Sequence, residues 1–340
     1  DFAKAVEAYA VKTYPDLKSR HIILSNLDME RSLLTSGGAR GYSYIPRAHL
    51  MVRLGLEKDG ATVDIFDSLG GLGHFEDQFD DPSKAFPLID ELYRKVKEKQ
   101  EGVYAEAGTH DCILMPNLAG ILAHEAIGHT TEADLVMGGS VAAHFMNQQV
   151  ASPLISLVDF AHSYNGELCP VPVHLDDEGT PAEDCVIIEK GVLKNYMHNK
   201  ESAAKLGMKP LGNARAFMFM DEPLIRMRNT AILPGTSKLS DMIASMDSGY
   251  VLSHPANGQA DSTGEFMFAV TMGYEVKNGK LGKAIQNTTI SGVAFDMMKS
   301  VTMVSDDMKW KSNGFCGKKQ PMSVGMGGPA IKCRVNLGGK

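Results

Sequence analysis

Two histidines and a glutamate stand close together in residues 124 to 129, which read HEAIGH. The segment resembles the zinc-binding pattern H-E-x-x-H, except that one more residue separates His124 from His129. On a regular α-helix, side chains four residues apart differ by about 40° around the axis, whereas side chains five residues apart differ by about 140°. A helix that carries both histidines must therefore deform before they can bind one ion.

The surrounding segment, residues 117 to 134, is expected to form a helix with Asn117 as its N-cap after Pro116. Two distortions of such a helix would bring the histidines together: a single-turn π-bulge, or an end of the helix near Gly128. Gly128 stands where either distortion is easiest, because glycine tolerates backbone conformations that other residues avoid.

The same residues also allow a purely structural interpretation. His124 would then be a hydrogen-bonded core histidine, Glu125 a solvent-facing residue and His129 part of a helix cap. The relaxed pattern taken alone does not decide between the two interpretations, because short motifs also occur by chance.

A catalytic zinc ion needs a third protein ligand and an open position for water. Glu132 and Asp134 are near in sequence, but reaching the ion that binds both histidines would require further local distortion. Cys316, in the glycine-containing segment SNGFCGKKQPMSVGMGGP, can approach from elsewhere in the fold, and Lys318 beside it would favour the thiolate form that binds zinc. The alternative for Cys316 is a buried free cysteine.

The composition is that of a folded globular protein. Of the 340 residues, 44% are hydrophobic and 22% are charged, which excludes a disordered chain or a collagen-like fibre and favours about two domains. The formal charge is -7, with 34 Lys and Arg against 41 Asp and Glu. Because no basic run could neutralise a row of phosphates, nucleic-acid binding is not expected.

The cysteines and the apolar stretches indicate where the protein works. Its 5 cysteines are odd in number and far apart, which is unlike a disulfide framework and fits a reducing compartment. No apolar stretch approaches the roughly 20 residues needed to span a bilayer. We therefore expect a cytoplasmic protein without a membrane span.

The pattern of the chain predicts an α+β fold. Residues 1–115 should form a mixed α/β domain, with helices over 2–14 and 83–99 and a hairpin that turns at Lys58-Asp59-Gly60.

Residues 116–340 should form a β-rich, mainly antiparallel domain that carries Cys316, with the histidine helix at the junction of the two domains. Two hairpins are expected there, turning at Lys190-Gly191 and at Asn278-Gly279. Short helices are expected over 237–246 and 293–304.

Further segments accompany HEAIGHTTEAD and FCGKKQPMSVGMGGP in a fixed order. They are HLDDEGTP at 174–181, GVLKNYM at 191–197, GNAR at 212–215, RMRNT at 226–230, GQADSTGEFMFAV at 258–270 and GYEVKNGK at 273–280. Together these segments resemble the TldD/PmbA family, the so-called modulator of DNA gyrase proteins, which are metallopeptidases. The intact histidine motif makes the chain similar to the TldD-like members.

The resemblance implies one catalytic Zn²⁺ per chain, with His124, His129 and Cys316 as its ligands and Glu125 as the catalytic base. It also implies a small or unfolded peptide as substrate, and a homodimer or a heterodimer with a PmbA-like paralogue. Relative to the family, the N-terminus is expected to be short by about one domain. We expect the peptide to bind in extended form against a strand edge, because main-chain pairing recognises peptides with little regard to sequence.

Other functions remain open at this stage. The main alternative is a non-catalytic, peptide-binding partner subunit of a TldD/PmbA-type assembly. A cysteine hydrolase with Cys316 as nucleophile is a second alternative. A regulator of gyrase is a third, although the acidic balance of charge argues against contact with DNA.

Overall fold

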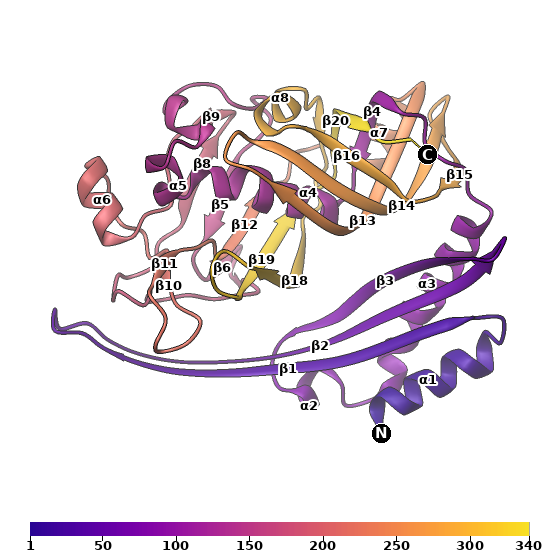
Figure 1. Cartoon of the computed structure of the whole chain (residues 1–340), viewed down its shortest axis with the longest axis horizontal. Coiled ribbons are helices and arrows are strands. Elements are labelled where there is room, and N and C mark those ends of the chain that lie inside the picture. The colour runs from indigo at the N-terminus through magenta and orange to yellow at the C-terminus, as the bar shows by residue number, and fades with distance from the viewer. Residues whose placement is uncertain (340) are drawn as a thin grey trace.

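The computed structural model describes residues 1–339, and its N-terminal part is an antiparallel sheet of order β1-β2-β3 that packs on helices (Figure 1). The elements of this part are α1 (Phe2–Thr13), β1 (Ser19–Leu34), β2 (Arg40–Lys58), β3 (Ala61–Leu72), α2 (Phe75–Gln78), η1 (Pro82–Ala85) and α3 (Phe86–Gln100). The helices expected over 2–14 and 83–99 are confirmed as α1 and as η1 followed by α3. Aliphatic side chains of α3 and of the sheet form one buried core.

Strands β2 and β3 form the expected hairpin, in which Lys58 pairs with Ala61. The two turn residues, Asp59 and Gly60, have φ angles of 52° and 78°. Such left-handed pairs suit two-residue hairpins because their twist matches that of the flanking strands. Two turn residues with the same left-handed backbone also join β8 to β9, at Lys190-Gly191, and β14 to β15, at Asn278-Gly279. All three predicted hairpins are therefore confirmed.

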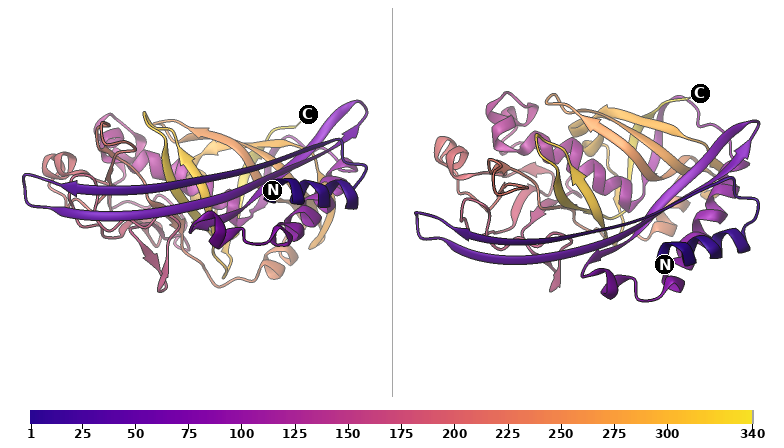
Figure 2. Two further views of the ribbon diagram at one scale, coloured as in Figure 1. Left: turned by 90° about the horizontal axis from the view of Figure 1, so that it is seen from below. Right: turned by 60° about the horizontal axis from the view of Figure 1, so that its bottom comes forward.

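Strands β1 and β2 continue well beyond β3. Residues 47–58 of β2 pair with β3, whereas residues 40–46 pair with β1 alone. We call residues 28–46, the part of the β1–β2 ribbon beyond β3, the arm. Figures 1 and 2 show the arm running along the C-terminal part of the molecule toward β10 and β11.

A seven-stranded sheet is one of the two main sheets of the C-terminal part. Its strands are β4 (Gly108–Leu114), β13 (Ser248–Ala260), β14 (Glu265–Lys277), β15 (Lys280–Ile285), β16 (Thr288–Val293), β17 (Met303–Val304) and β20 (Ile331–Leu337). The sheet closes on itself, because β13 pairs with β4 on one side and with β14 on the other. A closed sheet has fewer free edges that could aggregate.

A six-stranded sheet lies beside it. Its order is β18 (Lys309–Cys316), β19 (Met322–Gly328), β12 (Asn229–Ile232), β5 (Leu157–Phe160), β8 (Cys185–Glu189) and β9 (Val192–Leu193). The pairs β12–β19 and β13–β4 are parallel, and the other pairs between named strands are antiparallel within residues 1–339. The expected α+β class is confirmed.

Helices and short strands connect the two sheets. They are α4 (Pro116–Leu122), η2 (Ala123–Gly128), η3 (His129–Thr131), α5 (Ala133–Met137), η4 (Val141–His144), β6 (Ser163–Tyr164), β7 (Glu167–Leu168), α6 (Lys200–Leu206), β10 (Ala214–Arg215), β11 (Leu224–Ile225), α7 (Leu239–Ala244) and α8 (Ala294–Lys299). The helices expected over 237–246 and 293–304 are confirmed in shorter form as α7 and α8. Across residues 1–339, every helix falls short of the length or the apolar character that a bilayer crossing requires.

Candidate metal centre

Helix α4, which leads to the histidines, begins two residues earlier than expected. Pro116 is its first residue and Met115 takes the N-cap position, so the prediction of Asn117 as N-cap was wrong. Proline suits the first turn because the N–H that it lacks would have no helical partner there. The helix packs closely on β19, since a side chain at Gly120 would meet the backbone nitrogen of Gly327 at 3.2 Å.

The helix widens into a π-helix over Ala123–Gly128. The backbone N–H of His129 donates to the carbonyl of His124, five residues earlier. The wider turn brings the two imidazoles to the same side, with ring centroids 5.2 Å apart. The π-bulge, one of the two distortions that the spacing required, is therefore confirmed.

Cys316, at the end of β18, meets the two histidines. Its Sγ lies 3.3 Å from Nε2 of His129, and one ligand atom from each of His124, His129 and Cys316 lies within 4.8 Å of the other two. His124 and Cys316 are buried and His129 is partly buried. Residues 187 positions apart in sequence thus form one cluster.

The chemistry of this cluster fits a zinc ion. Both ring nitrogens of His124 are buried, and neither has a hydrogen-bond partner among the described residues. Buried polar atoms are rarely left unpaired, so these orphaned nitrogens indicate a missing partner. Imidazole nitrogen and thiolate sulfur are both ligands that zinc binds, and three protein ligands leave a fourth position open for water.

The charges of the cluster prepare the sulfur for a metal. Burial alone would raise the pKa of the Cys316 thiol, but the neighbouring imidazoles of His124 and His129 outweigh burial and lower that pKa to about 4. Burial would likewise lower the pKa of His129, but the charge of Glu132 and the contact with Cys316 raise it to about 10. Without metal, the cluster holds a thiolate next to an imidazolium.

Glu132 orients His129 from behind. Its Oε2 accepts a hydrogen bond from Nδ1 of His129 at 2.8 Å, which turns Nε2 toward Cys316. A carboxylate on the far nitrogen of a ligand histidine fixes the tautomer and the ring orientation. In the sequence, Glu132 was considered only as a possible metal ligand. Its spacing of three residues from His129 could have indicated that its carboxylate contacts the imidazole.

Lys318 does not play the part that the sequence suggested. Its Nζ lies 3.1 Å from Glu132 and 2.7 Å from Asp134, and it also donates to the carbonyl of Ile225. Lys318 therefore does not have the expected role of stabilising the thiolate of Cys316. Instead, the two histidines lower the pKa of the thiol. Lys318 instead ties the cysteine loop to the segment after the histidines.

Glu125 lies at the border between the cluster and an open cleft of about 490 Å³. Its side chain is 23% exposed, and its Oε2 lies 3.5 Å from Nε2 of His129. The cleft is bounded by residues 258–262, which include the end of β13 and the two residues after it, and by residues 315–318 at and after the end of β18. Among the residues that the structure describes, Glu125 is thus the one carboxylate that lies beside the imidazoles and also lines this cleft.

A buried arginine holds the cysteine loop in place. The guanidinium of Arg226 donates to the carbonyls of Cys316, Lys318 and Gln320 at 2.7, 2.8 and 3.0 Å. The next residue, Met227, packs against the π-helix: a side chain at Gly128 would come within 2.0 Å of its Sδ. The segment RMRNT, noted in the sequence only for its resemblance, therefore supports both halves of the cluster.

Comparisons with known proteins agree with this geometry. The family profile described as PmbA/TldA metallopeptidase C-terminal domain matches residues 107–339. A protein of Saccharolobus solfataricus, named zinc metalloprotease TldD homolog, is 31% identical over 98% of this chain and 72% of its own length. The metalloprotease TldD homolog of Buchnera aphidicola subsp. Acyrthosiphon pisum is 39% identical over 69% of this chain and 49% of its own. The chain belongs to the PmbA/TldD metallopeptidase family, as its motifs predicted.

Solved structures show the same fold. A protein of Thermotoga maritima described as a modulator of a DNA gyrase matches 99% of this chain and 73% of its own, with a TM-score of 0.80 at 21% identity. TldE of Thermococcus kodakarensis matches 97% of this chain and 72% of its own, with a TM-score of 0.74 at 18% identity. These likenesses support the fold assignment.

Proposed function

We propose that the chain is a zinc-dependent peptidase that hydrolyses small or unfolded peptides. The observation that carries this proposal is the convergence of His124, whose ring nitrogens have no partner among the described residues, with His129 and Cys316, beside the carboxylate of Glu125. In the proposal, these three side chains hold one Zn²⁺ and Glu125 is the catalytic base. When bound there, zinc would supply an acidified water and polarise the scissile carbonyl.

The protein groups divide the remaining work. Glu125 accepts the proton of the attacking water and then gives it to the departing amine nitrogen. Glu132 keeps Nδ1 of His129 protonated, so that Nε2 faces the ion. Arg226 holds the loop of Cys316 at a fixed distance from the helix.

The cleft offers two strand edges for an extended peptide. Strand β13 pairs with β4 only over residues 250–252, so its residues 255–260 have β14 on one side and no strand on the other among the described residues. Strand β18 is the edge of its sheet, and its end carries Cys316 and the exposed Phe315. A peptide that pairs with either edge would lie beside Glu125, which supports recognition through the main chain.

Assembly and location complete the proposal. We propose a dimer, either of two copies or with a PmbA-like paralogue, that acts in the cytoplasm. A fold shared with a TldE protein is consistent with such a pair. A member that only binds peptide for an active partner would not need the orphaned histidine or the thiolate, so the cluster favours catalysis.

Metal analysis combined with a Glu125→Ala variant tests the proposed function. We expect about one zinc per chain in both proteins, and a loss of peptidase activity of at least about a hundredfold in the variant, because general base catalysis contributes about 10²–10⁴-fold. Glu189→Ala, at an exposed position of β8, is the matched control and should keep full activity. Unchanged activity of Glu125→Ala would remove Glu125 from the mechanism, and a wild-type protein without bound metal would favour the non-catalytic subunit.

A further inference from the structure

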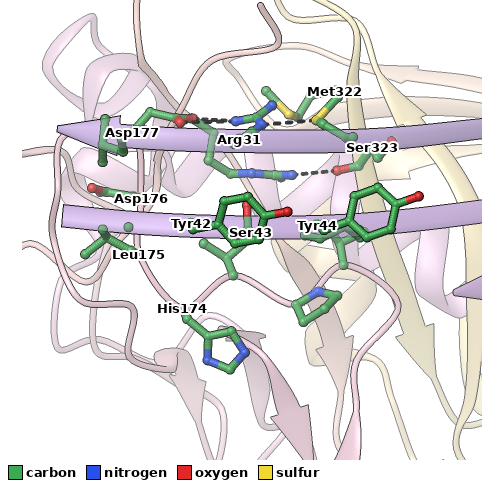
Figure 3. A pocket seen from close by; sticks show the side chains of 18 of the residues that line it. Arg31, Tyr42, Ser43, Tyr44, His174, Leu175, Asp176, Asp177, Met322 and Ser323 are labelled. Carbon is green, nitrogen blue, oxygen red and sulfur yellow. Dashed lines mark hydrogen bonds and ion pairs between the residues drawn. The ribbon is translucent and has the colours of Figure 1, made fainter. Parts of the chain in front are cut away.

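A second cavity lies between the arm and the C-terminal part. Its volume is about 350 Å³. One wall is the arm, and the facing wall is the segment 171–177, with residues 322 and 323 of β19 at its side. Figure 3 shows Tyr42, Ser43 and Tyr44 along β2 on one side of the cavity, and His174 and Leu175 on the other.

The edge of β2 is unpaired where it borders this cavity. Residues 41–45 of β2 pair with β1, and β3 joins the other edge only from Arg47 onward. Alternate residues of such an edge direct their N–H and C=O groups away from the partner strand, which makes the edge a template for another strand. At about 3.4 Å per residue, the free edge is long enough for about four or five residues of extended peptide.

The walls of the cavity suit apolar side chains. Aliphatic residues of β1 and of the segment 171–175 line it, together with Tyr42 and Tyr44. These two tyrosines are 69% and 43% exposed, so their rings lack the cover that aromatic groups usually receive. Mostly apolar lining with a few polar groups is typical of ligand sites.

A cation without a counter-ion stands at one end of the free edge. Arg47 lines the cavity and is 5% exposed, and of its guanidinium nitrogens only Nη2 has an acceptor among the described residues, the carbonyl of Ser312. Its neighbour His49 is neutral at physiological pH, because burial and the charge of Arg47 lower its pKa to about 4. A buried charge without a partner is costly, which indicates that an anion completes the site.

The other charged groups of the cavity have more hydrogen-bond or ion-pair partners than Arg47 has. Arg31 pairs with Asp177 at 2.9 Å, and both carboxylate oxygens of Asp176 accept backbone N–H groups. Arg215 donates to the carbonyls of Met227 and Ser323. Because Arg31 lies opposite Ser43, four residues from Arg47 along β2, the acidic end of the cavity is about 13 Å from Arg47.

We propose that this cavity is a binding site for the free carboxyl end of a short apolar peptide, which pairs with residues 41–45 of β2 and places its terminal carboxylate on Arg47. The proposal shares its ligand class, peptides, with the proposed function but requires neither metal nor hydrolysis. The site is separate from the cleft beside Glu125, since the two cavities have no lining residue in common.

Fluorescence anisotropy with a labelled probe tests the site. The probe is a fluorescein-labelled Gly-Ala-Leu-Ala-Leu peptide, used as free acid and as carboxamide on the full chain carrying Glu125→Gln, so that it is not consumed. We expect the acid to bind at least about tenfold more tightly than the amide, because hydrogen bonds to a charged group are the stronger ones. Arg47→Met should abolish this difference, whereas Arg40→Met, an exposed arginine on the same strand, should keep it. The same affinities are expected with zinc and with EDTA.

A second measurement does not depend on a variant that folds. Hydrogen exchange of the wild-type chain without metal, saturated with the unlabelled acid, should slow in residues 41–47 and not in 256–260. Equal binding of acid and amide, retention of the difference in Arg47→Met, or protection confined to 256–260 would overturn the proposal. So would 3-phenylpropionate competing as strongly as the peptide, since a small acid would then suffice.

Discussion

Cys316 and His129 carry opposite charges in the metal-free protein. The pKa of about 4 for the thiol means that Cys316 is a thiolate throughout the neutral range. The pKa of about 10 for His129 means that its imidazole keeps a proton over the same range. A metal must therefore displace a proton from His129, but none from Cys316.

This proton balance predicts how zinc binding depends on pH. We expect the apparent affinity to rise about tenfold per pH unit between about pH 6 and 8, because each unit lowers the proton competition at His129 tenfold. Competition with a chelating dye of known pH behaviour measures this slope. In Glu132→Gln, which removes the charge that raises the pKa of His129, the rise should level off at lower pH. A pH-independent affinity in the wild type would show that His129 is already neutral.

The cluster also depends on how one loop docks on one helix. Arg226 holds the loop of Cys316 from the buried side through three carbonyls. Lys318 holds it from the cleft side, where its ammonium contacts Glu132 and Asp134. Since Glu132 also orients His129, the lysine links the third ligand to the second through one carboxylate.

A Lys318→Met variant tests this link. We expect zinc to bind about 10–100-fold more weakly, the usual cost of losing a group that orients a metal ligand. Lys318→Arg should restore most of the affinity, because the guanidinium can reach the same two carboxylates. The affinity is measured by chelator competition, alongside the melting temperature of the metal-free protein.

Lys319→Met is the matched control, since Lys319 is exposed on the same loop and makes no ion pair within residues 1–339. It should bind zinc as the wild type does. If Lys318→Met also binds zinc with full affinity, the lysine has no role in positioning Cys316.

Features of the whole molecule that rest on local chemistry could be predicted from the sequence. The hairpin at Asp59-Gly60 follows from residues that accept left-handed backbone. The π-helix before His129 is one of the two distortions that the spacing of the histidines predicted. The family motifs then supplied Cys316 as the third member of the cluster.

Features that rest on contacts between distant residues could not be predicted in this way. Lys318 and Asp134 are 184 positions apart, so no local pattern shows that they meet. The closure of β13 between β4 and β14 depends in the same way on pairing across the chain. The arm was not predicted, because the residues of its strand β1 alternate between partly buried and exposed and none is fully buried. The strand therefore has no buried apolar face that a sequence pattern could indicate.

Two separate cavities are formed by different parts of the molecule. The closed sheet and the six-stranded sheet meet over α4 and bring Cys316 to the histidines. The arm crosses the same six-stranded sheet at Ser323 and adds the cavity with Arg47. The expected division of the chain into domains 1–115 and 116–340 stays a prediction.

X-ray absorption at the zinc edge tests the central claim most directly, because it reports the atoms around the metal. The protein loaded with one equivalent of zinc should show one sulfur at about 2.3 Å and two imidazole nitrogens at about 2.0–2.1 Å, with a light atom in the fourth position. In Cys316→Ser the sulfur shell should vanish. A wild-type spectrum with only nitrogen and oxygen neighbours would contradict the binding of one ion by His124, His129 and Cys316 together.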